Sequence, residues 1–281
     1  MKIPSRLRLI AVAVLTAFVS SAHAQDSYVL AKKGETPKPG TKCELTKKMA
    51  MKNGVLKVKA GEQNMDGTCS ISESESETIE YKAADKVKRT VTAGEKSQKM
   101  TMNGQEMPDE PRAHALLKVP VILTKEDGEW SAELEDGKEP TDEQQTELEK
   151  KEKDQDKSSD AEMYGTEARK VGETWTVDAA DLPFAKQEED TKGSLKITFK
   201  GVEDCGGKKC ARLEGPMELT GKTDQGQKLS LKGDVVIFRS LEDHMDMKVD
   251  FTGKMEMSGD IPNGSMSMSG EMTMSEVTKV N

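Results

Sequence analysis

Apolar and polar residues alternate with a period of two along much of the chain. The clearest example is segment 244–258. There, one parity holds Met245, Met247, Val249, Phe251, Met255 and Met257, and the other holds His244, Asp246, Lys248, Asp250 and Thr252. Because successive side chains of a β-strand point to opposite faces, this strand has one apolar and one polar face. The pattern predicts an antiparallel sheet with one face toward solvent.

Turn residues divide the rest of the chain into two strand-rich regions. Residues 43–135 predict short strands, the first β half. The second β half, residues 171–281, predicts strands at 193–203, 210–222, 227–239, 244–258 and 264–278. Three pairs, Asn53-Gly54, Asn103-Gly104 and Asn263-Gly264, predict two-residue type I′ hairpin turns, in which both residues have positive φ. We therefore expect a mainly β fold: an antiparallel, strongly curved sheet or half-barrel, which the two strand-rich regions could form together as two halves.

The segment between the halves, residues 136–170, has a different pattern. Lys125 to Asp160 contains 15 acidic and 6 basic residues, and Thr141-Asp142-Glu143-Gln144 resembles a capping box that opens a helix. The predicted helix runs from the capping box to about Lys157, and Leu148 is its only aliphatic residue. We therefore expect a solvated helix or linker, supported by Glu147–Lys151 and Glu149–Lys153 pairs. An acidic docking or calcium-buffering segment is the alternative, although no EF-hand spacing is present.

The N-terminus has the pattern of an export signal. A basic start (Lys2, Arg6, Arg8) precedes an apolar run, 9–19, and the small-x-small sequence Ala22-His23-Ala24. We expect a signal peptide over 1–24, cleavage after Ala24, a flexible segment over 25–42 and a periplasmic or secreted protein. An uncleaved membrane anchor is the alternative, but the run is much shorter than the roughly 20 residues of a membrane span. No integral membrane span is expected elsewhere.

Composition narrows the class of partner. The chain is 33% charged and 4% aromatic, with a net charge of −9 that becomes −12 without the three cations of the signal. An acidic chain without basic runs is unsuited to nucleic acid, so we expect no nucleic-acid partner. The oligomeric state is left open.

All four cysteines lie after the predicted signal. An exported chain with an even cysteine count usually forms disulfides, and the short Cys205–Cys210 spacing suits a hairpin. We predict the disulfides Cys43–Cys69 and Cys205–Cys210. A metal site or redox pair at Cys205 and Cys210 is the alternative, although no second close pair or nearby His completes it.

Methionines are concentrated in six Met-x-Met pairs. These are Met49/Met51, Met100/Met102, Met245/Met247, Met255/Met257, Met266/Met268 and Met272/Met274. Since period two places both members on one strand face, they could fill a closed core, because Met adapts to irregular gaps. They could instead line a groove for an acyl chain, a greasy peptide or an envelope protein. The predicted ligand face is Met245, Met247, Phe251, Met255, Met257, Met266, Met268, Met272 and Met274.

A soft-metal site is the third interpretation of these pairs. Thioethers are ligands for Cu(I) and Ag(I), and the candidates are Met245, Met247, Met255 and Met257. His244 cannot complete this set because it has the opposite strand parity.

Catalytic motifs such as G-x-S-x-G, H-E-x-x-H and the phosphate-binding glycine loop do not occur in the sequence. Only His114 and His244 remain after the signal, and we expect both to be ordinary surface residues. The sequence predicts a protein without catalysis and without a cofactor.

The segment Val171-Gly172-Glu173-Thr174-Trp175 resembles a V-G-[DE]-x-W segment of uncharacterised exported bacterial β-rich proteins. Those proteins are in turn similar to lipoprotein-carrier half-barrels. The resemblance covers residues 114–280 and implies a curved sheet able to hold acyl chains, but it carries over no binding residues. If this segment is extended, Trp175 shares a face with Val177 and is expected to anchor the core rather than contact a ligand.

Overall fold

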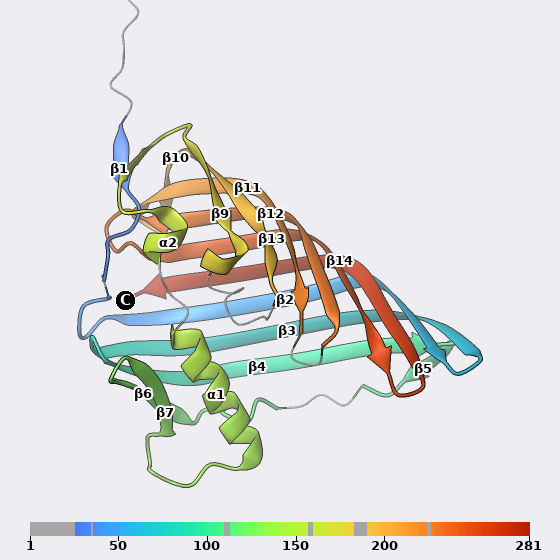
Figure 1. Ribbon diagram of the computed structural model, residues 1–281. Helices are drawn as coiled ribbons and strands as arrows, with labels where there is room; N and C mark the ends of the chain where they lie inside the picture. Colours follow the sequence, from blue (N-terminus) through green and yellow to red (C-terminus); the bar gives the residue numbers. More distant parts are fainter. Residues whose placement is uncertain (1–25, 35, 110–112, 157–159, 183–189, 224–225) are drawn as a thin grey trace, which may run out of the picture.

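The computed structural model describes residues 26–34, 36–109, 113–156, 160–182, 190–223 and 226–281. The predicted signal peptide and its cleavage site lie outside these residues. Within them the chain is mainly β, as predicted, and is dominated by one antiparallel sheet of 12 strands that is not closed into a barrel (Figure 1). No helix in the described part of the chain is long and apolar enough to span a membrane.

The elements of the first half precede two helices, and those of the second half follow them. β1 (Ser27–Val29) lies in the segment predicted to be flexible, and the first half contains β2 (Lys42–Ala60), β3 (Gln63–Ala83), β4 (Lys86–Met102), β5 (Gln105–Met107), β6 (Pro120–Glu126) and β7 (Glu129–Leu134). The helices are α1 (Asp142–Asp156) and α2 (Asp160–Tyr164). The second half contains β8 (Ala168–Lys170), β9 (Thr174–Asp178), a 3-10 turn (Ala179–Asp181), β10 (Lys192–Cys205), β11 (Lys208–Lys222), β12 (Lys228–Ser240), β13 (Asp246–Ile261) and β14 (Gly264–Val280).

The two halves form one continuous sheet. Its order is β7-β6-β4-β3-β2-β14-β13-β12-β11-β10-β9, with β5 beside β4, and β1 pairs separately with β8. Each half is a series of antiparallel neighbours, and the halves join where β14 pairs with β2, from Gly264 opposite Ala60 to Val280 opposite Cys43. The expectation of short strands in the first half is wrong, since β2, β3 and β4 have 19, 21 and 17 residues.

The Asn-Gly pairs show why those strands are longer than predicted. Asn103 and Gly104 have φ values of 49° and 78° and turn the chain between β4 and β5, as predicted. Asn53 also has positive φ, 52°, but it lies at a bulge inside β2, where the register with β3 shifts between Met51 and Gly54. Because Asn tolerates the left-handed conformation in a bulge as well as in a turn, the same residues mark two different structures.

The third predicted Asn-Gly turn is displaced by one residue. Ile261 pairs with Gly264, so the connecting residues between β13 and β14 are Pro262 and Asn263. Asn263 has a φ of 64°. Proline followed by a residue of positive φ is the order of a type II turn rather than type I′.

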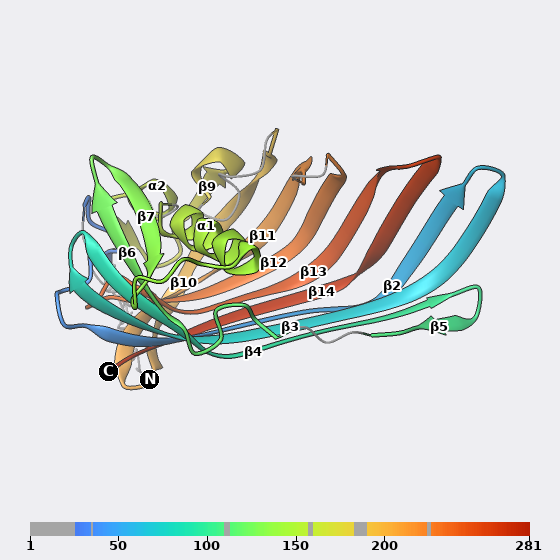
Figure 2. The same ribbon diagram turned by 90° about the horizontal axis from the view of Figure 1, so that it is seen from below.

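The sheet is strongly curved, and its helices lie on one side. Figure 2 shows the free ends of the long strands curving toward the side on which α1 and α2 lie, while the helices themselves lie near the opposite end of those strands. We call the face toward the helices the inner face and the other the outer face. Along β13, Phe251, Met255 and Met257 have inner-face parity and are less exposed than Thr252 and Lys254 between them, which confirms the predicted alternation.

Helix α1 begins at the predicted capping box. The Gln144 amide donates to Thr141 Oγ1 (3.3 Å), and the Thr141 amide donates to Gln144 Oε1 (3.1 Å). Most of its described side chains are exposed or half-buried, as predicted, but the helix is docked on the sheet: Leu148 is only 2% exposed and packs with buried residues of β6 and β7 and the loop before them. Leu148 thus supplies the apolar contact of a helix whose remaining side chains are polar.

The predicted disulfides are absent from the structure, where all four cysteines are free thiols. Cys43 pairs with Ile79, whereas Cys69 pairs with Gly54. At 3.3 Å per residue, Cys43 and Gly54 lie about 36 Å apart along β2, far beyond the reach of a disulfide.

The other two cysteines lie at the β10–β11 hairpin. Cys205 and Cys210 interact there as a reduced pair: burial raises the pKa of Cys210 to about 12, and the neighbouring Cys205 adds to that rise. A metal-binding group of His, Cys, Asp and Glu does not occur in the described part of the chain.

Candidate functional site: a methionine-lined sheet face

Strand register brings methionines from both halves onto the inner face. Met49 lies opposite Met274 and Met51 opposite Met272 across the β2–β14 seam, and Met257 lies opposite Met268 between β13 and β14. We call this surface the methionine face. It comprises Met49, Met51, Leu56, Met65, Met100, Met102, Phe251, Met255, Met257, Met266, Met268, Met272 and Met274.

Glycines make room for these long side chains to lie along the sheet. A Cβ atom at Gly270 would lie 2.8 Å from Met51 Cγ and 3.1 Å from its sulfur. A Cβ at Gly67 would lie 2.6 Å from the Met102 sulfur. Thioether side chains therefore cover the backbone at glycine positions, and the unbranched, flexible shape of Met suits this arrangement.

The methionine face is only partly closed. Met51 and Met272 are 2% and 6% exposed, whereas most of its other methionines are half-buried. In Figure 2 the helices lie near the β6–β7 end of the sheet, and the curved strand ends extend beyond them. An inner surface of this kind can contact an additional apolar molecule, whereas a closed core cannot.

The structure brings part of the predicted ligand face together on one surface and gives that surface a different extent. Phe251 and the methionines of β14 and distal β13 lie together. Met247 lies near the other end of β13, and Met245 precedes that strand, so both are remote from distal β13. Sequence reasoning missed the contribution of β2, β3 and β4, although the Met49/Met51 and Met100/Met102 pairs were a visible signal, because only the tertiary structure pairs β2 with β14.

The predicted four-methionine metal site is not formed as one cluster. Met247 and Met255 are eight residues apart on one strand, about 26 Å at 3.3 Å per residue. The thioethers of Met245 and Met247 therefore cannot share a small ion with those of Met255 and Met257, since metal–ligand distances are a few ångströms.

A charged cluster lies on the inner face beside the methionine face. The Arg89 guanidinium donates two hydrogen bonds to the Glu77 carboxylate (Nε–Oε1 3.0 Å, Nη2–Oε2 2.5 Å), and Lys151 Nζ of α1 lies 2.7 Å from Glu77 Oε1. Burial opposes ionisation of Glu77, but the two cations outweigh it and lower the pKa of Glu77 to about 2. The predicted pairing of Lys151 with Glu147 is replaced by this contact between α1 and β3.

His114 fastens the same region and is not an ordinary surface residue. Its Nε2 lies 3.2 Å from Glu75 Oε2 and 3.5 Å from Glu147 Oε2, and its Nδ1 accepts the Leu116 amide hydrogen (3.1 Å). The hydrogen bond from His114 is the largest cause of the lowered pKa of Glu75. Both ring nitrogens are engaged, so the arrangement joins β3, α1 and the loop before β6. His244 is also buried, at 8% exposure.

Trp175 anchors the second half, as predicted. It is partly buried against the main core, and its Nε1 donates to the carbonyl of Met163 in α2 (3.1 Å). The Arg169 guanidinium lies 4.5 Å from the centre of its ring. The Trp175 side chain therefore has a packing role.

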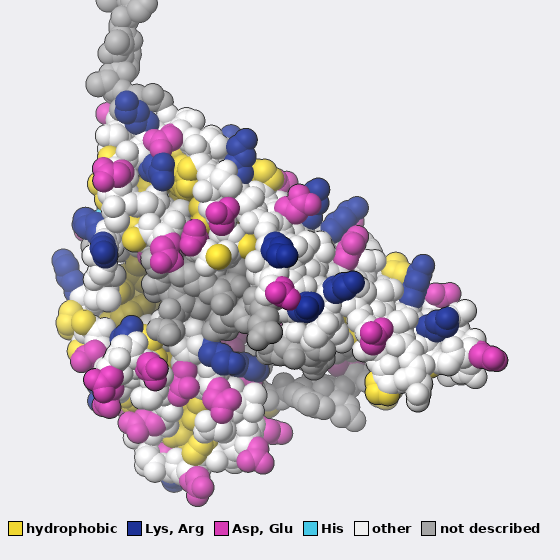
Figure 3. Space-filling model, viewed as in Figure 1, with side chains coloured by type: hydrophobic (Ala, Val, Ile, Leu, Met, Phe, Trp, Pro, Cys, Tyr) yellow, Lys and Arg dark blue, Asp and Glu magenta, His cyan; other side chains and the backbone are white. Residues whose placement is uncertain are grey.

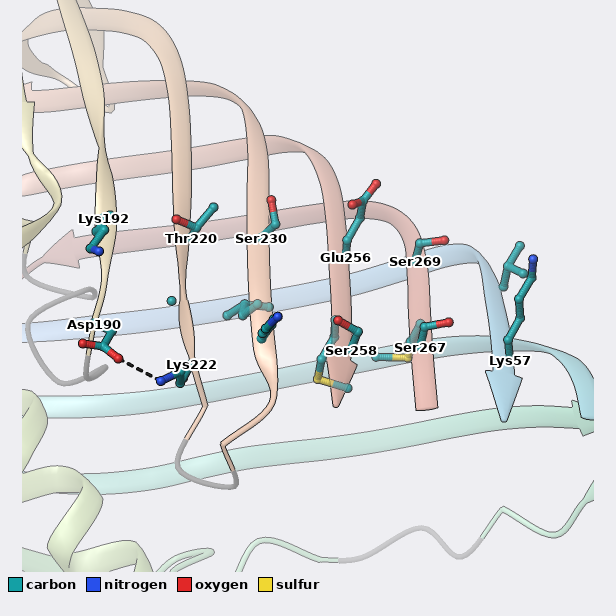
Figure 4. A pocket seen from close by; sticks show the side chains of 16 residues that line it. Lys57, Asp190, Lys192, Thr220, Lys222, Ser230, Glu256, Ser258, Ser267 and Ser269 are labelled. Atoms are coloured by element: carbon teal, nitrogen blue, oxygen red, sulfur yellow. Dashed lines mark hydrogen bonds and ion pairs between the residues drawn. The ribbon is translucent and has the colours of Figure 1, made fainter. Parts of the chain in front are cut away.

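Two hollows adjoin the strands of the methionine face. One, of about 690 Å³, lies at the free ends of β10 to β14 and β2, where Met257 and Met268 line it together with serine, threonine and lysine side chains (Figure 4). The Lys222 ammonium there lies 2.9 Å from Asp190 Oδ2. The other, of about 1010 Å³, is lined by Met49, Met274 and polar residues of the central strands.

Charges of both signs are interspersed over the hairpin ends on the molecular surface visible in Figure 3, whereas acidic side chains gather over α1, β6 and β7. That acidic surface corresponds to the middle segment of the chain. Among the side chains coloured in Figure 3, Lys and Arg form no extended patch.

Comparison with known proteins gives structural likenesses only. No protein-family model and no curated protein matches the chain. A structure of lipid–protein interactions in lipovitellin is similar over 88% of this chain, with 10% identity and a TM-score of 0.43, and the chain spans 26% of the length of that protein.

Two further structures are similar at lower TM-scores. A DUF1329 family protein from Desulfovibrio piger has 8% identity and a TM-score of 0.18, with 88% of this chain and 85% of that one covered. A β-barrel-like DUF1849 protein from Brucella abortus has 8% identity and a TM-score of 0.17, with 85% and 99% covered. These weak likenesses assign the chain to no family.

Proposed function

We propose that this chain is an exported, non-catalytic binding protein that holds an apolar chain, such as an acyl chain, on its methionine face. The observation that carries the proposal is the half-buried state of that face in a chain that is otherwise rich in charged residues. A surface of this kind is more often a binding site than an unused part of a soluble protein.

The dimensions and chemistry of the methionine face favour a long, flexible ligand. From Met274 to Met266 the β14 part of the face extends about 26 Å at 3.3 Å per residue, enough for an extended acyl chain. Its side chains are unbranched thioethers that adapt to varied apolar shapes. Phe251 is the only aromatic ring among its residues, so it lacks the stacking platform that would favour a sugar.

A pair of glutamine substitutions tests the proposal. We expect the native protein to bind dansyl-undecanoic acid, and M257Q/M268Q to weaken the Kd roughly tenfold or more, because burying each unpaired amide costs about 1 to 3 kcal/mol. Glutamine keeps the length of methionine, and the half-buried sites let its amide stay hydrated in the free protein. Fluorescence titration measures the Kd.

The matched control is K254Q/E271Q, a cross-strand pair on the outer face of the same two strands. It should leave probe binding unchanged. Equal weakening by both double variants, or native protein that neither binds the probe nor releases apolar molecules on organic extraction, would overturn the proposal.

A further inference from the structure

The methionine face contains sulfur atoms of two degrees of exposure. Met51 and Met272 are almost fully buried at the seam between the halves. Among the half-buried methionines, Met255, Met257, Met266 and Met268 lie on β13 and β14 toward their free ends, and Met100 lies on β4. Because oxidation of a thioether requires an oxidant to reach the sulfur atom, these two sets differ in reactivity toward a small peroxide.

We propose that Met255, Met257, Met266, Met268 and Met100 are oxidation sites, at which a peroxide converts the methionine face from an apolar to a polar surface. A lone pair of the sulfur attacks one peroxide oxygen, the O–O bond breaks, and the sulfur is oxidised by two electrons to the sulfoxide. Hydrogen peroxide is reduced to one molecule of water. A dithiol reductant reverses the change by forming a disulfide and water.

Met100 already has a polar partner for an oxidised sulfur. The side-chain amide of Gln98 lies 2.8 Å from Met100 Sδ and donates to it. A sulfoxide oxygen is a much better hydrogen-bond acceptor than a thioether sulfur. Gln98 would therefore stabilise the oxidised form of Met100, which lies opposite Cys69 between β3 and β4.

Packing protects the seam methionines from the same reaction. The Met51 side chain lies against the backbone at Gly270 and Gly54, and Met51 Cε would be 3.1 Å from a Cβ atom at Gly54. Met51 and Met272 are only 2% and 6% exposed, so peroxide has little access to either side chain. Sulfoxidation should thus make the face polar while the seam that joins the two halves remains intact.

The proposed effect on a ligand rests on the proposed function, but the oxidation sites do not. Each sulfoxide places a polar group where an apolar chain would lie, and contact with that chain would leave the group without a hydrogen-bond partner. Oxidation of several positions should therefore weaken binding of dansyl-undecanoic acid by about tenfold or more.

Peptide mapping by mass spectrometry after graded treatment of the folded protein with hydrogen peroxide tests the proposal. Within the methionine face, fragment-ion spectra that locate each added oxygen should show Met255, Met257, Met266, Met268 and Met100 oxidised first and Met51 and Met272 last. Met107, which is 48% exposed outside that face, serves as the reference for free access of peroxide. In urea the two classes should merge. One common oxidation rate in the folded protein, or early oxidation at Met51 and Met272, would overturn the proposal.

A leucine variant separates this inference from the proposed function. M100L/M255L/M257L/M266L/M268L keeps the apolar volume without the five proposed oxidation sites. Whatever its Kd for the probe before treatment, that Kd should change little on exposure to peroxide, whereas the Kd of the native protein should rise about tenfold or more. If the native protein does not bind the probe, the proposed function is wrong. The order in which the methionines are oxidised would still test the proposed oxidation sites. If peroxide raises the Kd equally in both proteins, oxidation of these five methionines is not the cause of the lost binding, and the proposal is disproved.

Discussion

At the scale of single residues, buried charge is concentrated at a few fully paired positions. Glu77 is 2% exposed and is bonded to Arg89 and Lys151, while Arg239 is 1% exposed and contacts Asp246 (Nη1–Oδ1 2.7 Å) and Asp160 (Nη2–Oδ2 2.7 Å). A buried charge without partners is strongly destabilising, so each network must be retained whole or replaced whole. Both networks also join segments that are distant in sequence.

Replacing Glu77 by Gln should lower the free energy of unfolding by about 3 to 5 kcal/mol at pH 7, since Arg89 and Lys151 stay buried without their counter-charge. The pKa of Glu77 is lowered in the folded state to about 2. Its contribution is therefore complete above the ordinary carboxyl pKa and is lost as pH falls toward 2. Urea denaturation from pH 7 to pH 2.5 should show the gap between wild type and E77Q narrowing over that range.

The control for this prediction is E73Q, on the same strand face. The Glu73 carboxylate is 44% exposed and lies 3.7 Å from Lys96 Nζ, so its loss should cost less than about 1 kcal/mol. Equal stability of E77Q and E73Q would show that the buried network contributes nothing beyond a surface ion pair.

At the scale of elements, α1 depends on local capping and on one apolar contact. Its capping box stabilises the first turn, and Leu148 connects it to the small core beneath β6 and β7. The acidic composition of α1 disfavours burial of any larger face. We therefore expect the packing of α1 against the sheet to be easily disrupted by mutation, whereas capping fixes the residue at which the helix begins.

Leu148→Ala should weaken docking of α1 by about 2 to 5 kcal/mol, because it removes a buried side chain from a small core. Hydrogen exchange should then accelerate at the amides of α1 and remain slow in β13. Thr146→Ala, in the exposed part of the same helix, should change neither. Retained protection of α1 in L148A would show that its polar contacts, such as Lys151 with Glu77 and Glu152 with the Ala132 amide, suffice to hold it.

At the scale of the whole molecule, the seam between β2 and β14 makes the two halves one sheet. Residues as far apart as Met49 and Met274 are paired across it, and the inner face is continuous from β3 to β12. If one half is unfolded, the seam strand of the other half, β2 or β14, loses its hydrogen-bonded partner, and the methionine face is interrupted there. The halves should therefore unfold together.

Single-tryptophan variants can measure that coupling. Trp130 lies in β7 and Trp175 in β9, at opposite edges of the sheet. Fluorescence of W175F and W130F should report transitions whose urea midpoints each coincide with the far-UV circular dichroism midpoint of the same variant. A fluorescence transition that precedes loss of the sheet in either variant would instead indicate two independently unfolding halves.

Much of the candidate site was predictable because its information is local. The parity of methionines along β13 and β14 defines one strand face, and the Thr141–Gln144 spacing defines a helix start, since both depend only on backbone geometry over a few residues. The part of the methionine face that β2, β3 and β4 contribute was not predictable. It requires knowing that β14 pairs with β2 and in which register.

The sequence by itself thus determined the alternation of faces, the antiparallel strand class, the apolar character of the methionine positions and the start of α1. Tertiary structure alone decided that Asn53 forms a bulge, that Lys151 turns to Glu77, and that Cys43 lies far from Cys69. The physical reason is that neighbours in the chain fix side-chain periodicity and capping. The free energy of packing the entire sheet selects which distant strands meet, and therefore which side chains share a surface.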